Sequence, residues 1–122
     1  MGVYLNGSSG FYDASKYRGV TFWAKIEAGR STTMRMNLSD NQTVAEGNIC
    51  SGDKCWDHFG ATISNLTTTW NRYSFRWSDL TQQGWGVPQV AKINPASLRG
   101  FEFSTQANVD FGVYIDDLAF IP

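Results

Sequence analysis

The sequence lacks any run of about eighteen apolar residues, which is the shortest length expected of a membrane-spanning helix. It also lacks a helical repeat of apolar residues over any useful length, which argues against a helical bundle or a coiled coil. Its 122 residues are enough for one domain with one hydrophobic core. We therefore expect a single non-helical domain covering residues 1–122.

No excess of charge of one sign is present. Ten basic and eleven acidic residues give a formal net charge of −1, and charged residues make up only 17% of the chain. This balance argues against binding to nucleic acid or to an anionic membrane surface. Because Gly, Ser, Thr and Asn are abundant instead, we expect an exported protein whose partner is an uncharged polar molecule.

Catalytic motifs are also scarce. His58 is the single histidine, and no Gly-x-Ser-x-Gly sequence or phosphate-binding glycine loop accompanies it. Carboxylates that could form a pair for glycoside hydrolysis are scattered without a pattern. They are Glu27, Glu46, Glu102, Asp110, Asp116 and Asp117. We expect a protein that is not an enzyme, with a small glycanase or lyase domain as the alternative.

Cysteine occurs only twice, at Cys50 and Cys55. The spacing suits a small disulfide ring in a glycine-containing loop and matches no common zinc motif. A disulfide implies an oxidising compartment. The sequence therefore predicts a secreted, extracellular protein, and we expect it to be one part of a longer precursor.

Short β-branched and aromatic segments bounded by turn residues recur along the chain and predict an all-β, antiparallel β-sandwich. The expected strands cover residues 2–6, 18–28, 31–39, 60–65, 69–78, 100–106 and 111–121. Val20, Phe22, Ala24 and Ile26 alternate with polar residues, as do Met34, Met36 and Leu38, so both sets should face the core. A short link between these two strands predicts that they pair as a hairpin. One helical turn, beginning at Asn94 and Pro95, is the only helix expected.

Aromatic residues make up 15% of the chain, more than a small core needs. Two long loops, 40–59 and 81–93, carry Trp56 and Trp85, either as stacking platforms for a ligand or as plugs beneath their own loops. Trp23 lies on the strand face opposite the core residues and is a third candidate. Trp70 and Trp77 are expected in the core.

Polar side chains that alternation places outward could hydrogen bond a ligand around these rings. The chosen candidates are Arg35, Asn37, Arg72 and Gln106, and any of them could instead be an ordinary solvated residue. His58 either contacts the ligand or locks its own loop through Asp57 or the main chain. Asp116 and Asp117 could contribute to a calcium site if oxygens from another segment join them, or could simply cap a turn.

Five segments between about residues 11 and 121 resemble the β-jelly-roll carbohydrate-binding modules attached to bacterial cellulases and other polysaccharide-degrading enzymes. They are 19–25 (GVTFWAK), 57–60 (DHFG), 70–73 (WNRY), 78–86 (SDLTQQGWG) and 114–120 (YIDDLAF). Within that group the loop pair with His58 and Trp85 is most similar to family 81.

The resemblance implies a jelly-roll fold that binds β-glucan chains without catalysis, such as cello-oligosaccharides, amorphous cellulose, mixed-linkage glucan or xyloglucan. Trp23, Trp56 and Trp85 would stack on the sugar in one open cleft, and the module would hold a tethered glycoside hydrolase near its substrate. No cofactor is required by this interpretation, although a structural calcium ion at Asp116 or Asp117 is an option. A structural sandwich that docks proteins is the further alternative.

Overall fold

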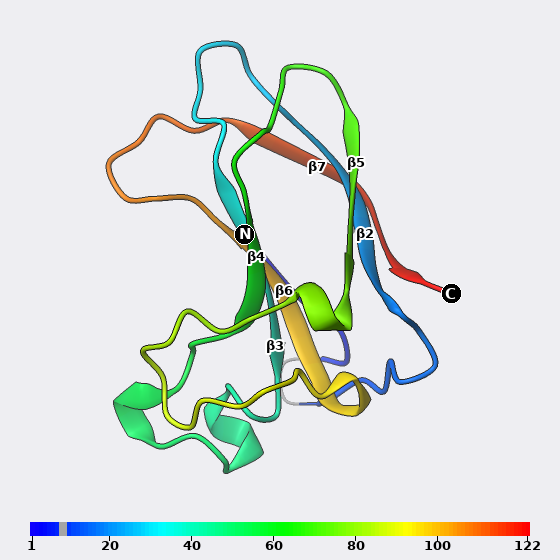
Figure 1. The fold of residues 1–122 in the computed structure, drawn as a ribbon, viewed down its shortest axis with the longest axis vertical. Coiled ribbons are helices and arrows are strands. Elements are labelled where there is room, and N and C mark those ends of the chain that lie inside the picture. Colours follow the sequence, from blue (N-terminus) through cyan, green and yellow to red (C-terminus); the bar gives the residue numbers. More distant parts are fainter. Residues whose placement is uncertain (8–9) are drawn as a thin grey trace.

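The computed structural model of the protein describes residues 1–7 and 10–122, and almost all of its regular structure is β-strand (Figure 1). The strands are β1 (Gly2–Tyr4), β2 (Gly19–Ile26), β3 (Met34–Asp40), β4 (Phe59–Ile63), β5 (Asn71–Arg76), β6 (Leu98–Ser104) and β7 (Val113–Ile121). Four short 3-10 helices make up the rest of the regular structure: η1 (Ala45–Gly47), η2 (Gly52–Lys54), η3 (Trp77–Asp79) and η4 (Pro95–Ser97).

The strands form two antiparallel sheets. One has the order β1-β6-β3-β4 and the other the order β5-β2-β7. Apart from β3 and β4, strands that pair in a sheet are not consecutive in the chain, as expected when the chain crosses repeatedly from one sheet to the other. The fold is the all-β, jelly-roll-like sandwich predicted from the sequence.

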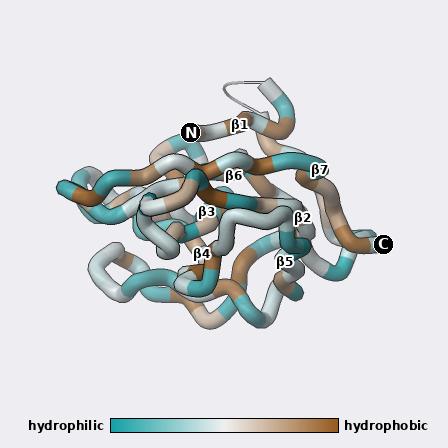
Figure 2. Tube along the Cα trace, turned by 90° about the horizontal axis from the view of Figure 1, so that it is seen from above, coloured by the Kyte–Doolittle hydropathy of each residue, from teal (hydrophilic) through white to brown (hydrophobic). Residues whose placement is uncertain are grey.

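The core lies between the sheets, as the alternation predicted. Val20, Phe22 and Ala24 of β2 are completely buried, and Met36 and Leu38 of β3 meet them from the opposite sheet. Hydrophobic and hydrophilic residues accordingly alternate along much of the chain (Figure 2). Each sheet therefore has one face against the core and one outer face.

The predicted hairpin between residues 18–28 and 31–39 is wrong. β2 pairs with β5 and β7, whereas β3 pairs with β4 and β6, so the short link between β2 and β3 crosses from one sheet to the other. Both strands need an apolar face, and they supply it from opposite sides of one core. Alternation determines which face of a strand is buried, but it does not identify the neighbouring strand.

Two smaller predictions also need correction. The turn at Pro95–Ser97 is present, and the Asn94 side chain accepts from the Ala96 N–H at 3.2 Å, but three more 3-10 turns occur among the described residues. Trp77 packs against the core, as expected, and its indole N–H donates to the Tyr17 carbonyl at 2.8 Å. Trp70 is exposed instead, because it precedes β5 and projects from the outer face of its sheet.

Candidate functional site

The outer face of the four-stranded sheet is lined by polar side chains and glycines. The strand register sets them in three rows: Tyr4 with Gly100 and Ser39, then Gly2 with Glu102, Asn37 and Gly60, then Ser104 with Arg35 and Thr62. Rows two residues apart along a strand are separated by about 7 Å. This arrangement is an extended polar surface, which we call the polar sheet face.

A hollow of about 360 Å³ lies at one end of the polar sheet face. Exposed aromatic rings of Tyr4, on β1, and Trp56, on the loop before β4, contribute to its wall. His58, Ser39 and Glu102 supply hydrogen-bonding groups between them. Apolar rings beside a polar floor suit a ligand that has both apolar faces and hydroxyl groups.

A second hollow of about 230 Å³ lies at the other end of the same face. Arg35, Thr62 and Ser104 line it from the sheet, and Gln83 and Gln106 line it from neighbouring loops. The predicted candidates Arg35 and Gln106 are thus brought together, although they are far apart in the sequence.

Arg35 and Asn37 belong to one hydrogen-bonded network in the middle of the polar sheet face. Arg35 Nε donates to Asn37 Oδ1 at 2.8 Å, and Asn37 Nδ2 donates to Ser104 Oγ at 3.2 Å. Arg35 Nη2 reaches the carbonyl oxygen of Thr81 at 2.7 Å. Burial lowers the pKa of the Arg35 guanidinium, and the negative charge of Asp57 partly opposes this shift. The network fixes both side chains in place and ties the 81–93 loop to the sheet.

Gly60 makes this network possible. An added Cβ there would lie 2.8 Å from Asn37 Oδ1, 3.0 Å from Arg35 Nη2 and within 2.3 Å of the Met36 carbonyl oxygen. The main chain of Gly60 also exchanges two hydrogen bonds of 3.0 Å with Thr81. This backbone pairing extends the sheet beyond β4 to the segment at Thr81.

The predicted disulfide joins Cys50 to Cys55 and shapes the loop that carries Trp56. Cys55 is buried, while the next residue, Trp56, is 55% exposed and adopts a positive φ of 72°. The Trp56 N–H donates to the Thr43 carbonyl at 2.8 Å. Trp56 is therefore not a plug beneath its loop, because a fixed main chain presents it to solvent.

Asp57 organises the loop that carries Trp85. Its buried carboxylate accepts hydrogen bonds of 2.8–2.9 Å from the N–H groups of Gln83, Gly84 and Gly86 and from the side-chain amide of Gln89. Burial opposes ionisation, but these donors outweigh it and hold the pKa of Asp57 below its ordinary value. Asp57 thus joins the two long loops through four hydrogen bonds.

Trp85 is 49% exposed at the tip of this loop. Its indole nitrogen donates to Gln83 Oε1 at 3.4 Å, which connects the ring to the second hollow. Gly86 packs against Asp57 so closely that an added Cβ would lie 2.5 Å from Asp57 Cβ. The positive φ of Gly84, 106°, lets the chain turn before the tryptophan. Trp85, like Trp56, is presented outward by a supported loop.

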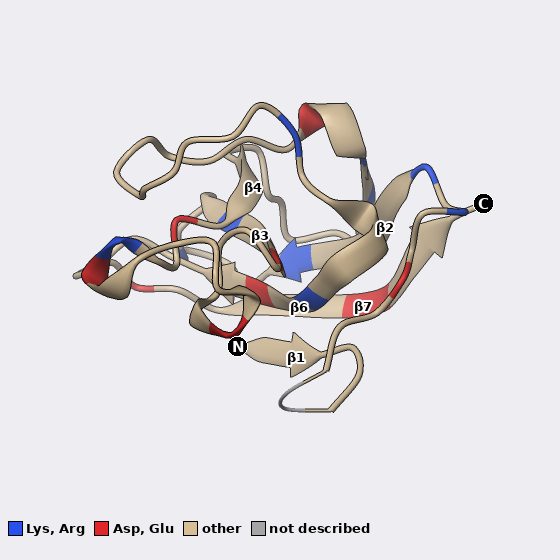
Figure 3. Ribbon diagram, turned by 90° about the horizontal axis from the view of Figure 1, so that it is seen from below, with Lys and Arg blue, Asp and Glu red and all other residues tan. Residues whose placement is uncertain are grey.

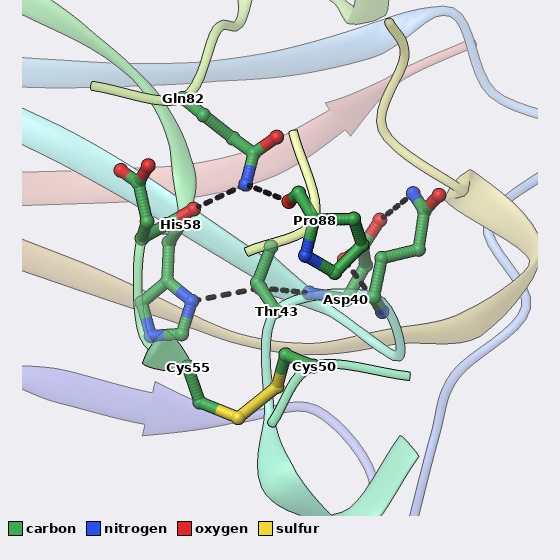
Figure 4. Close-up of a disulfide and its surroundings, with 9 residues drawn as sticks. Asp40, Thr43, Cys50, Cys55, His58, Gln82 and Pro88 are labelled. Atoms are coloured by element: carbon green, nitrogen blue, oxygen red, sulfur yellow. Dashed lines mark hydrogen bonds between the residues drawn. A yellow bond between two sulfur atoms is a disulfide. The ribbon is translucent and has the colours of Figure 1, made fainter. Parts of the chain in front are cut away.

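His58 is held by Thr43 and not by Asp57 (Figure 4). Its Nδ1 lies 2.8 Å from Thr43 Oγ1, which also accepts from the N–H of the buried Asp40 at 3.4 Å. Burial lowers the pKa of His58, while the carboxylates of Glu102, Asp40 and Asp57 oppose that effect. The imidazole is therefore neutral at neutral pH and lines the first hollow.

Gln82 and Asp40 secure the ends of the loop pair. The Gln82 amide donates to the carbonyl oxygens of Asp57 and Pro88, at 3.0 and 3.4 Å (Figure 4). Asp40 accepts from the Gln42 amide at 2.7 Å and from the Asn94 N–H at 2.8 Å, while burial raises the pKa of its carboxyl. The rim of the polar sheet face is therefore a fixed structure.

The tryptophans predicted to share a cleft are divided between two faces. Trp23 and Arg72 are cross-strand neighbours on the outer face of the three-stranded sheet, on the other side of the core from Trp56 and Trp85. The expected single cleft with three tryptophans is therefore wrong. Arg72 Nε donates to Thr21 Oγ1 at 3.0 Å on that second face.

Asp116 and Asp117 lie on β7, on the edge of the three-stranded sheet, and both are exposed. Asp116 Oδ1 accepts from the Asp117 N–H at 2.8 Å. Within residues 1–7 and 10–122, no group of three or more His, Cys, Asp or Glu side chains is placed to hold a metal ion. Calcium favours six to eight oxygen ligands, so carbonyl oxygens and water would have to complete a site here. Calcium binding by this pair stays a prediction.

Sequence reasoning missed Asp57 and Tyr4. Two features of the sequence could have indicated Asp57: it is a carboxylate close to the disulfide loop, and a second loop of the chain contains glycines. The main-chain N–H groups of such a loop need an acceptor when they are buried. The signal for Tyr4 was weaker, because a short first strand does not indicate which sheet it joins.

Positively and negatively charged residues are interspersed along the part of the chain that the structure describes (Figure 3). Among the described residues, no helix has the length and apolar character needed to cross a bilayer. The mixture of charges in the fold agrees with the formal net charge of −1.

No known protein family and no curated protein matches this sequence. Among solved structures, the chain is similar to a family 11 carbohydrate-binding module of the cellulosomal cellulase Lic26A-Cel5E of Clostridium thermocellum, with a TM-score of 0.66 and 16% sequence identity. The match covers 98% of this chain and 64% of that chain, so this chain spans slightly less than two thirds of its length. At this identity the likeness shows a shared fold, the β-sandwich of a carbohydrate-binding module.

Proposed function

We propose that this chain is a non-catalytic carbohydrate-binding module that binds neutral β-glucan chains along the polar sheet face. The observation that carries the proposal is the pair of exposed tryptophans, Trp56 and Trp85, held by fixed loops beside that face. A pyranose ring has an apolar C–H face and a rim of hydroxyls, so it stacks on an aromatic ring while polar groups bind its rim.

The roles of the residues follow from their positions. Tyr4 and Trp56 flank the first hollow and offer their rings to one part of the glucan, and Trp85 offers its ring near the second hollow. Arg35, from the polar sheet face, and Gln106, from a neighbouring loop, donate to hydroxyls at the second hollow, and Asn37 holds Arg35 in place. Since these groups are already ordered, little conformational entropy is lost on binding.

The wider proposal is that the module is secreted by a bacterium and keeps an attached glycoside hydrolase close to its polysaccharide. The disulfide supports an oxidising compartment. The sequence resemblance to family 81 modules and the shared fold support the association with polysaccharide-degrading enzymes. The function of such a module is to raise the local concentration of enzyme on its substrate.

Affinity electrophoresis tests the proposal. The protein is run through native gels that contain barley β-glucan, xyloglucan, xylan, mannan, pectin or no polymer, beside an inert reference protein. Retardation on the glucan gels alone is the expected result. Unchanged mobility on every gel would contradict the proposal.

Two controls separate the alternatives. Release of reducing sugar or of unsaturated product from the same polymers would favour the glycanase or lyase alternative. Retention of a protein partner in the presence of saturating cellohexaose would favour the docking alternative.

A further inference from the structure

The outer face of the three-stranded sheet carries three large exposed rings. Trp23 is 39% exposed, Trp70 is 41% exposed and Tyr114 is 46% exposed. Exposed aromatic side chains gathered on one sheet face are unusual in a soluble domain, and they mark sites of interaction. We call this surface the aromatic sheet face.

The strand register brings the three rings together. Trp23 is directly opposite Asp116 on β7, and Tyr114 is directly opposite Lys25, the residue two positions after Trp23. On the other side, Trp70 comes just before Asn71, which pairs with Ala24. Trp23 is therefore a diagonal neighbour of both other rings, at about 7–8 Å.

The side chains between the rings hold them in place. Lys25 Nζ lies 5.1 Å from the centroid of the Trp70 ring and 5.4 Å from that of Tyr114, so one cation bridges two aromatic faces. The hydroxyl of Tyr114 donates to Glu27 Oε1 at 2.8 Å. These contacts order the Trp70 and Tyr114 rings, which therefore lose little freedom when a ligand covers them.

The charges on the aromatic sheet face indicate an uncharged partner. Three cations and three carboxylates offset one another here, so neither an anion nor a cation is favoured over the whole surface: Lys25, Arg72 and Arg30 with Asp116, Glu27 and Asp110. A dry protein interface would have to bury these charges at a cost, whereas a hydrated sugar chain can cover the rings and leave the charged groups solvated.

We infer that Trp23, Trp70 and Tyr114 form a second carbohydrate-binding face, which takes the apolar pyranose faces of a neutral polysaccharide. This inference rests on the proposed function for its ligand class, but its site is separate. The two faces lie on opposite sides of the core, and stacked sheets are about 10 Å apart. One molecule therefore holds two polysaccharide chains at once, and its retention on a polymer benefits from both contacts.

The five tryptophan indole N–H groups give separate readouts in a ¹H–¹⁵N correlation spectrum of the whole chain, once single Trp→Phe variants have assigned them. The protein is titrated with cellohexaose and with a xyloglucan heptasaccharide. The signals of Trp23 and Trp70 are expected to move together with those of Trp56 and Trp85. Trp77 is the internal control, because its indole is bonded to the Tyr17 carbonyl oxygen inside the fold.

The outcomes separate the two proposals. If only Trp56 and Trp85 respond, the second face is wrong and the proposed function stands. If only Trp23 and Trp70 respond, the second face is correct and the polar sheet face is wrong. If no indole responds to either sugar, both proposals are wrong.

A double variant gives an independent test. Trp23→Ala with Trp70→Ala is expected to weaken binding to amorphous cellulose about tenfold, because the variant loses one of the two faces that hold the polymer and keeps the other. Its circular dichroism spectrum should match that of the unchanged protein.

Sedimentation at rising protein concentration shows whether the face is covered by a second copy of the chain. Self-association abolished by the double variant would overturn the inference.

Discussion

The main-chain N–H of Gly86 donates to the carboxylate of Asp57, 29 positions earlier in the sequence, at 2.9 Å, and this contact joins the two long loops. Asp57 follows directly after Trp56, and Gly86 follows directly after Trp85. One buried carboxylate therefore determines the positions of both exposed tryptophans.

Replacing Asp57 by Ala removes the acceptor of four hydrogen bonds. The free energy of unfolding is expected to fall by about 3 kcal/mol, because buried donors then lack partners. Asp57→Asn should be milder, since one side-chain oxygen remains. Urea denaturation measures both changes, and Asp53→Asn is the matched control because Asp53 is exposed in the same disulfide loop. Unchanged stability of Asp57→Ala would show that the loops are joined in another way.

Acidification should loosen the Trp85 loop. The pKa of Asp57 is lowered in the fold, so its stabilisation is complete above the ordinary value of about 4 and is lost as the pH falls through the folded value. The protection of the Gln83, Gly84 and Gly86 N–H groups against hydrogen exchange, taken relative to the intrinsic exchange rate at each pH, should therefore fall below about pH 4. In Asp57→Asn this pH dependence should disappear; if it persists there, another group is responsible.

His58 should add a separate pH dependence at higher pH. Burial lowers its pKa, so the unfolded chain binds a proton more readily than the folded chain. Stability is therefore expected to decline as the pH falls below the ordinary histidine value of about 6.5, and to level off below the folded value. The contact with Thr43 makes His58→Gln a suitable comparison, because an amide can keep that hydrogen bond. A stability curve that is flat between pH 7 and 5 in the unchanged protein would contradict this prediction.

Particular residues show how far the sequence predicted this structure. The alternation at Val20, Phe22 and Ala24 identified a core face correctly, because a strand has only two faces and one was apolar. The same alternation says nothing about neighbours, so the pairing of β2 with β3 was wrong. A ring at the start of a strand can close the edge of a sandwich, which favours a core position for Trp70, yet its position before β5 leaves its ring outside.

The sequence predicted only part of the candidate site, because local patterns again did not show which segments come together in space. Trp56 and Trp85 were found because they lie on loops with local signals, a cysteine and two glycines. The resemblance to carbohydrate-binding modules implies one cleft for Trp23 and the two loop tryptophans. Alternation cannot correct this, because it gives the face of one strand but not the sheet to which the strand belongs. Asp57 was overlooked as an organising residue because all four of its donors lie more than twenty positions away.

Removing the disulfide should affect both stability and binding. Cys50→Ala with Cys55→Ala is expected to cost about 2 kcal/mol of unfolding free energy, the order expected for a small closed loop. Glucan binding should weaken as well, because Trp56 follows Cys55 and loses a fixed anchor. Thermal unfolding and affinity electrophoresis measure the two effects. Full retention on β-glucan by this variant would mean that the Trp56 loop keeps its shape without the bond.

The exposed tryptophans beside the polar sheet face should contribute to binding without contributing much to stability. Trp85→Ala and Trp56→Ala are each expected to weaken retention on β-glucan about tenfold, because each removes one large apolar contact with a sugar ring. Val87→Ala is the matched control, since Val87 is an exposed apolar residue of the Trp85 loop and keeps its N–H bond to the Lys54 carbonyl. Its retention should equal that of the unchanged protein. If Trp85→Ala is retained as strongly as Val87→Ala, Trp85 does not contact the ligand, and Tyr4 and Trp56 would have to supply the stacking at the first hollow.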